Sequence, residues 1–134
     1  MKILTTTLEA ELLASNIICF RPLLNDYEFG LEDAHDMARI YDTMAGGGVF
    51  ATLIDVVGTN ATATPEMRAY GAGRNYKSHQ VARAITSDAF FHRLLVNHFM
   101  KSLHAAVPTR VFSEKEPALK WLKEQMATYQ KTLK

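Results

Sequence analysis

The feature that most constrains the fold is a mainly apolar run, residues 49–56, that breaks into a loop of glycine, threonine and asparagine. Such a run without alternation predicts a strand covered on both faces, as in the middle of a mostly parallel sheet. Thr64-Pro65-Glu66 then predicts a helix start, because threonine caps, proline suits the first helical position and glutamate favours the positive end of a helix. Ligands and partners dock beyond the carboxyl ends of such strands, so residues 58–70 are the expected working surface.

The remaining elements alternate around this strand. Period-two alternation over residues 3–13 and an apolar run over 17–21 predict two strands, joined as a hairpin at Ser15-Asn16. Helices are predicted over 31–45, from residue 64 onward, from 87 or 88 to about 105, and from 113 or Pro117 to 133. Further strands are predicted over 80–86 and 109–112. The order ββαβαβαβα predicts an α/β fold: one domain over residues 1–134, with a mixed, mostly parallel sheet of about five strands and four helices.

Composition and net charge limit the classes of function that are expected for this chain. The 134 residues, 48% apolar and 22% charged, suffice to bury a core. A net charge of +1 argues against strong nonspecific binding of nucleic acid, and no specific binding is expected. No apolar run approaches the roughly 18 residues of a membrane span, and the N-terminus lacks a signal-peptide profile. With the lone Cys19 in an apolar run, where burial is expected, these features predict a cytoplasmic protein.

The charge is distributed unevenly along the chain. Residues 1–42 carry three Lys/Arg and eight Asp/Glu, a net of −5, while residues 43–134 carry twelve and six, a net of +6. The two halves can attract each other within one fold or across a dimer, or they can be solvated faces of differing sign. A homodimer is therefore a secondary expectation, to which Trp121 adds because it lies off the apolar stripe of its helix.

No set of residues in the sequence is enough by itself to indicate a catalytic site or a metal site. His92, His98 and His104 lie six apart on one predicted helix and do not converge, and no cysteine pair supports zinc. No Gly-x-Ser-x-Gly elbow is present. Asp55 and Thr86 end adjacent predicted strands, as in response-regulator receivers, but the acidic pair that Mg²⁺ needs is missing from residues 20–23. We therefore expect no cofactor and no metal, and favour a non-enzymatic protein.

Three stretches carry a resemblance to a known family. They are residues 53–58 (LIDVVG), 64–70 (TPEMRAY) and 107–122 (VPTRVFSEKEPALKWL). With the element order, they make the chain similar to the STAS/SpoIIAA-like family, above all to uncharacterised bacterial SpoIIAA-like proteins. The resemblance implies a regulatory interaction module, as in anti-sigma factor antagonists, where a partner kinase phosphorylates a serine near the second helix. The family's Asp-Ser-Ser-Gly pattern is absent here; Thr62 and Thr64 occupy the corresponding loop as candidate phosphorylation sites, and Thr64 is alternatively only a helix cap.

Two kinds of binding site follow from these features. The first is a surface for a protein partner beyond the central strand, made of Asp55, Gly58, Thr59, Thr62, Thr64, Arg68 and Tyr70. The second uses the basic and aromatic residues before the next strand as a pocket for a small anionic ligand, nucleotide or lipid, or as a weak active site, near Arg68, Arg74 and Tyr76. A solvated basic loop is the alternative for the second set.

Overall fold

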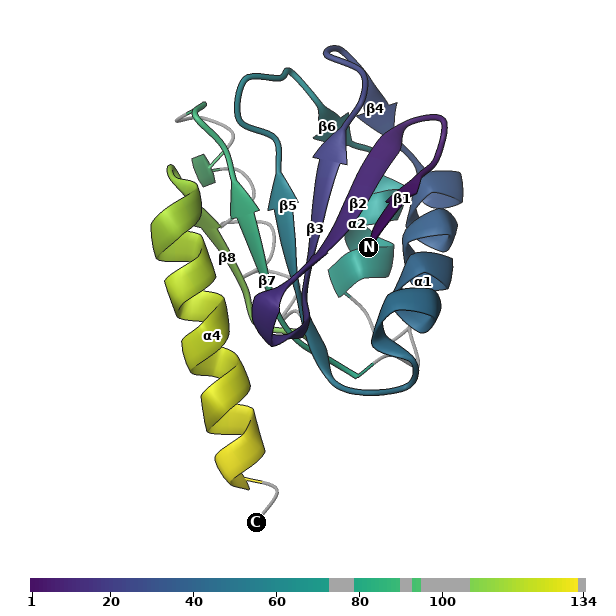
Figure 1. Ribbon diagram of the computed structural model, residues 1–134. Coiled ribbons are helices and arrows are strands. Elements are labelled where there is room, and N and C mark those ends of the chain that lie inside the picture. Colours follow the sequence, from purple (N-terminus) through teal and green to yellow (C-terminus); the bar gives the residue numbers. More distant parts are fainter. Residues whose placement is uncertain (73–78, 90–92, 95–106, 133–134) are drawn as a thin grey trace.

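A six-stranded sheet forms the centre of the computed structural model, which describes residues 1–72, 79–89, 93–94 and 107–132 (Figure 1). The strand order is β1-β2-β3-β5-β7-β8. The strands are Lys2–Leu4 (β1), Leu8–Leu13 (β2), Ile17–Pro22 (β3), Phe50–Asp55 (β5), Gln80–Thr86 (β7) and Thr109–Phe112 (β8). β1, β2 and β3 pair antiparallel, whereas β3, β5, β7 and β8 pair parallel. The predicted mixed, mostly parallel sheet is confirmed, with six strands instead of about five.

The additional strand arises where one strand was predicted over residues 3–13. This prediction is wrong because the Thr5 hydroxyl accepts a hydrogen bond from the Leu8 amide at 2.9 Å, and the Thr5 amide bonds the Leu8 carbonyl at 2.9 Å. The chain therefore turns, and β1 folds back onto β2 with Lys2 opposite Glu11. The predicted hairpin between β2 and β3 is confirmed; a 3₁₀ turn, Ala14–Asn16 (η1), joins the two strands.

The predicted central strand is confirmed as β5, which lies between β3 and β7. Both of its faces are buried. Phe50 belongs to one apolar core, and Ala51 and Leu53 belong to the other. The continuous apolar pattern of this segment therefore reflects burial on both sides of the sheet.

One face of the sheet is covered by α1, Leu31–Ala45, whose bounds match the prediction. Its buried stripe includes Met37, Ile40 and Tyr41, and the Tyr41 ring lies 4.6 Å from Phe50 between ring centroids. Gly46 ends the helix with φ of +58°, a left-handed conformation that glycine adopts at little cost. α2, Pro65–Ala72, lies against α1 on the same side (Figure 1).

The opposite face is covered by α4, Lys115–Thr132 (Figure 1). Ala118, Leu122 and Met126 are its buried residues. The helix begins at Lys115 and not at Pro117, because a proline in the first turn has no intrahelical N–H bond to lose. Trp121 packs on Phe112 of the same chain, with ring centroids 5.8 Å apart. Its position off the apolar stripe is therefore explained within one copy.

A second, two-stranded parallel sheet pairs β4, Glu28–Phe29, with β6, Thr62–Ala63. Strands of two residues carry no periodic pattern, so the sequence did not predict this pair. The third predicted helix, from 87 or 88 to about 105, lies mostly outside the described residues. Among the helices within the described ranges, none has the length and apolar content to cross a membrane.

Candidate functional site

The loop after β5 begins at Asp55, whose side chain is only 7% exposed. One carboxylate oxygen accepts hydrogen bonds from the Thr86 hydroxyl at 2.9 Å and from the Val57 amide at 3.2 Å. The other forms an ion pair with Arg21 Nε at 3.5 Å. The ends of β3, β5 and β7 thus meet at this carboxylate, which holds the start of the loop.

Sequence reasoning placed Asp55 and Thr86 at neighbouring strand ends, and the structure brings them together. It missed Arg21, although parallel pairing of β3 with β5 brings the end of β3 to the same edge of the sheet. The interactions of Asp55 all lie within the chain. Its geometry suits an anchor that positions the loop, and Val57 and Gly58 of that loop are exposed.

The loop then runs along residues 25–29 and is bonded to them. The Asn60 amide donates to the Asn25 carbonyl at 2.8 Å, and its side-chain nitrogen donates to Asp26 at 3.0 Å. The amides of Thr62 and Thr64 donate to the carbonyls of Tyr27 and Phe29 at 3.1 and 2.9 Å. Gly58 has φ of +80°, which favours glycine at this turn. The backbone of the predicted surface is therefore tied down along its length.

Three further contacts hold α2. The Thr64 hydroxyl accepts a hydrogen bond from the Met67 amide at 3.1 Å, the geometry of a helix cap. The Arg68 guanidinium donates to the Ala63 carbonyl at 2.6 Å. The Tyr70 ring lies edge-on to His35 of α1, with centroids 5.4 Å apart. Thr64, Arg68 and Tyr70 thus all have contacts within the chain.

The residues of this region that face outward are a different set. Val57, Gly58, Asn60, Thr62 and Glu66 are exposed, and Thr59 is half-buried with its hydroxyl bonded to the Val56 carbonyl at 2.8 Å. Within the described ranges, the Thr62 hydroxyl makes no hydrogen bond. Of the two threonines predicted as phosphorylation sites, Thr62 is the more accessible, because it is exposed whereas Thr64 is half-buried and its oxygen accepts a hydrogen bond from the helix.

The alternative pocket is placed only at Arg68, since Arg74 and Tyr76 lie outside the described residues. In the part of the chain that the structure describes, no three His, Cys, Asp or Glu residues gather as a metal site would require. Burial raises the pKa of the Cys19 thiol above its ordinary value, which disfavours the reactive thiolate.

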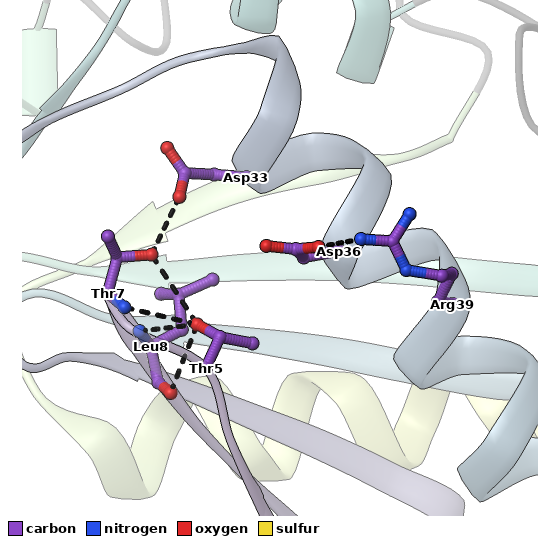
Figure 2. Close-up of polar contacts among 6 residues, drawn as sticks. All are labelled: Thr5, Thr7, Leu8, Asp33, Asp36 and Arg39. Carbon is purple, nitrogen blue, oxygen red and sulfur yellow. Dashed lines mark hydrogen bonds and ion pairs between the residues drawn. The ribbon is translucent and has the colours of Figure 1, made fainter.

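A second buried aspartate, Asp33 in the first turn of α1, was not predicted as a site residue. The Thr7 hydroxyl donates to one of its oxygens at 2.6 Å (Figure 2), and the Tyr27 hydroxyl and the Gly30 amide donate to the other at 2.9 Å each. The hydrogen bond to Asp33 raises the pKa of Tyr27. The bond between Asp36 and Arg39 is local to α1 (Figure 2). An acid three residues after Gly30 is the sequence signal that points to such a helix-start contact.

Comparison with known proteins identifies a family. A family model described as "Domain of unknown function (DUF7793)" matches residues 12–126. The chain belongs to this family. No curated protein matches it. Among solved structures, the chain is similar to an uncharacterised protein from the DUF3478 family with a SpoIIAA-like fold, from Shewanella loihica PV-4, with a TM-score of 0.58. That match has 16% identity and covers 86% of this chain and 91% of the other.

The structural match confirms the SpoIIAA-like fold predicted from the element order and the three sequence stretches. At this identity the similarity concerns the fold alone. A shared fold does not by itself imply a shared binding partner.

Proposed function

We propose that this protein is a non-enzymatic, cytoplasmic regulatory module that binds a protein partner through the loop after β5 and the start of α2. The observation that carries the proposal is that, at this edge of the sheet, one set of residues holds the backbone while another set faces solvent. Asp55, Thr64 and Arg68 hold the backbone, while Val57, Gly58 and Thr62 face solvent.

A loop fixed in this way loses little conformational entropy when a partner docks on it. Loops on a rigid scaffold are also where binding residues concentrate. The SpoIIAA-like fold of the Shewanella protein agrees with such a module at the level of architecture. Regulation through Thr62 fits the same surface, because a phosphate there would add about −1.5 to −2 charges to an exposed position.

The test uses one exposed position and a matched control. Thr62→Arg places a long cation on the proposed surface without removing a hydrogen bond of the described residues. Thr128→Arg makes the same change at an exposed position of α4. Immobilised wild type and both variants are incubated with a lysate of the source cells, and retained proteins are quantified by mass spectrometry.

The proposal predicts a protein that the wild type and Thr128→Arg retain and that Thr62→Arg loses. Thr62→Glu, which imitates a phosphate in charge, is expected to weaken the same capture. Equal capture by the two arginine variants, with both folded by circular dichroism, would remove this surface from consideration.

A further inference from the structure

Three exposed leucines lie on a segment that adjoins the proposed surface and to which no role has been assigned. We define residues 23–32, between β3 and the first turn of α1, as the acidic strap. Leu23, Leu24 and Leu31 of the strap are 48%, 45% and 40% exposed, and Val57 of the adjoining loop is 39% exposed. Where exposed apolar side chains adjoin one another within a polar rim, the surface is a candidate for contact with a protein partner.

The charges of the strap have one sign. Asp26, Glu28 and Glu32 are exposed, and residues 22–34 contain no lysine, arginine or histidine. Among the described residues none of these three carboxylates forms an ion pair, although Asp26 accepts a hydrogen bond from Asn60. The strap therefore presents leucines interspersed with uncompensated negative charge.

The strap is also held in place. The Leu23 amide donates to the Thr7 carbonyl at 2.9 Å, and the Tyr27 hydroxyl donates to Asp33. Tyr27 and Phe29 pack edge-to-face with centroids 4.7 Å apart, and Phe29 is buried in the core. The aromatic residues and the Leu23 backbone thus fasten the strap, while the side chains of its three leucines are 40–48% exposed.

We propose that the acidic strap and Val57 dock a basic amphipathic helix of a protein partner, with leucine-like residues against the exposed leucines and Lys/Arg against Asp26, Glu28 and Glu32. An amphipathic helix binds by laying its apolar face against apolar side chains of its receptor, and complementary charge steers the encounter. Anionic membranes and nucleic acids are disfavoured by the same carboxylates. The inference rests on the proposed partner-binding function and names the chemistry of the partner.

The experiment uses a fluorescent amphipathic peptide of leucine and lysine, about 18 residues long so that it can form a helix. Binding to the full chain is measured by anisotropy at low ionic strength. Glu28→Lys/Glu32→Lys reverses two charges of the strap, and Glu116→Lys/Glu124→Lys reverses two exposed charges on α4. Leu24→Ser tests the apolar contact. Leu4→Ser is its control, because Leu4 is 67% exposed and lies in β1, outside the strap.

The proposal expects the strap charge reversal to weaken binding by about tenfold or more and the α4 reversal by less than about twofold. Leu24→Ser weakens binding and Leu4→Ser does not. Equal effects of the two charge reversals would show binding to net charge alone and overturn the proposal, as would absence of wild-type binding or retention of the wild type on anionic vesicles.

Thr62→Arg separates this inference from the proposed function. If the lysate partner is lost with Thr62→Arg but kept by the strap variants, the strap proposal fails and the partner-binding loop stands. If the strap variants lose the partner and Thr62→Arg keeps it, the loop surface fails and the strap remains the docking site.

Discussion

Two segments meet at the same edge of the sheet and are each anchored by a buried aspartate, yet their outward side chains differ in chemistry. The loop after β5 is anchored by Asp55, and the acidic strap by Asp33. Outward, the loop offers mainly small polar groups, such as Gly58 and Thr62, whereas the strap offers leucines and carboxylates.

The comparison shows how the fold separates structural from accessible residues. A buried carboxylate can accept several hydrogen bonds and fix a segment without using its outward side chains. The two anchors differ in how their donors are distributed. Asp33 accepts donors on both oxygens, while the two hydrogen bonds to Asp55 reach one oxygen and an exposed arginine faces the other.

The largest predicted effect tests this difference between the anchors. Asp33→Asn neutralises a buried carboxylate that accepts three hydrogen bonds, and its NH₂ group must face either the Thr7 hydroxyl, which then has to accept instead of donate, or the Tyr27 hydroxyl and the Gly30 amide. We expect a loss of about 2–3 kcal/mol in the free energy of unfolding. Asp55→Asn can keep its one accepting oxygen toward Thr86 and Val57, and we expect at most about 1 kcal/mol. Urea denaturation at neutral pH measures both.

Equal losses for the two asparagine variants would contradict the difference between the anchors. The double variant serves as a check on independence. Because the two carboxylates share no partner, their losses should add within about 0.5 kcal/mol.

The next largest effect on stability distinguishes Thr64 from Thr62. Thr64→Ala removes the acceptor of the Met67 amide and should lower the free energy of unfolding by about 1 kcal/mol, while Thr64→Ser should retain most of it. Thr62→Ala, at an exposed position, should stay within about 0.5 kcal/mol of wild type. A larger loss for Thr62→Ala than for Thr64→Ala in urea titrations would show that the roles of anchor and accessible residue are assigned the wrong way round.

The smallest predicted effect is a pH dependence of the protein's stability that arises from Tyr27 of the strap. The hydrogen bond to Asp33 raises the pKa of Tyr27 above its ordinary 10.0. The folded state then holds the phenol proton more tightly than the unfolded state does, so this contribution to stability is full below pH 10.0 and is lost as the pH rises through the folded pKa. Wild type and Tyr27→Phe should therefore differ in stability near neutral pH and converge above pH 10.0 in urea titrations. A constant gap across that range would exclude the linkage.

Much of the fold was predictable because its patterns are local. The stripe of α1, its end at Gly46, the cap at Thr64 and the central position of β5 all depend on residues within a few positions of one another. The turn that separates β1 from β2 was missed because Thr5 to Thr7 continue the period-two alternation. A side-chain hydrogen bond, and not the hydrophobic pattern, ends the strand there.

The sequence predicted where the residues of the candidate site lie in the fold, but not all of their contacts. The sequence indicated the edge of the sheet beyond β5, because parallel strands end together. It did not separate Thr62, which is accessible, from Thr64, which caps α2. It also gave the acidic strap no role, because exposed leucines between β3 and α1 have no periodicity from which burial or exposure can be read.

By itself, the sequence determined the α/β alternation from β3 through β5 and β7 to α4, the mostly parallel sheet and the stretches that resemble SpoIIAA-like proteins. These follow from periodicity, capping and strand length, which act over a single turn or strand. Only the tertiary structure decided which carboxylates are buried, because Thr7 lies 26 residues from Asp33 and Asp55 lies 31 residues from Thr86. Contacts over such separations depend on how the sheet and helices pack, and that packing left the leucines of the strap facing solvent.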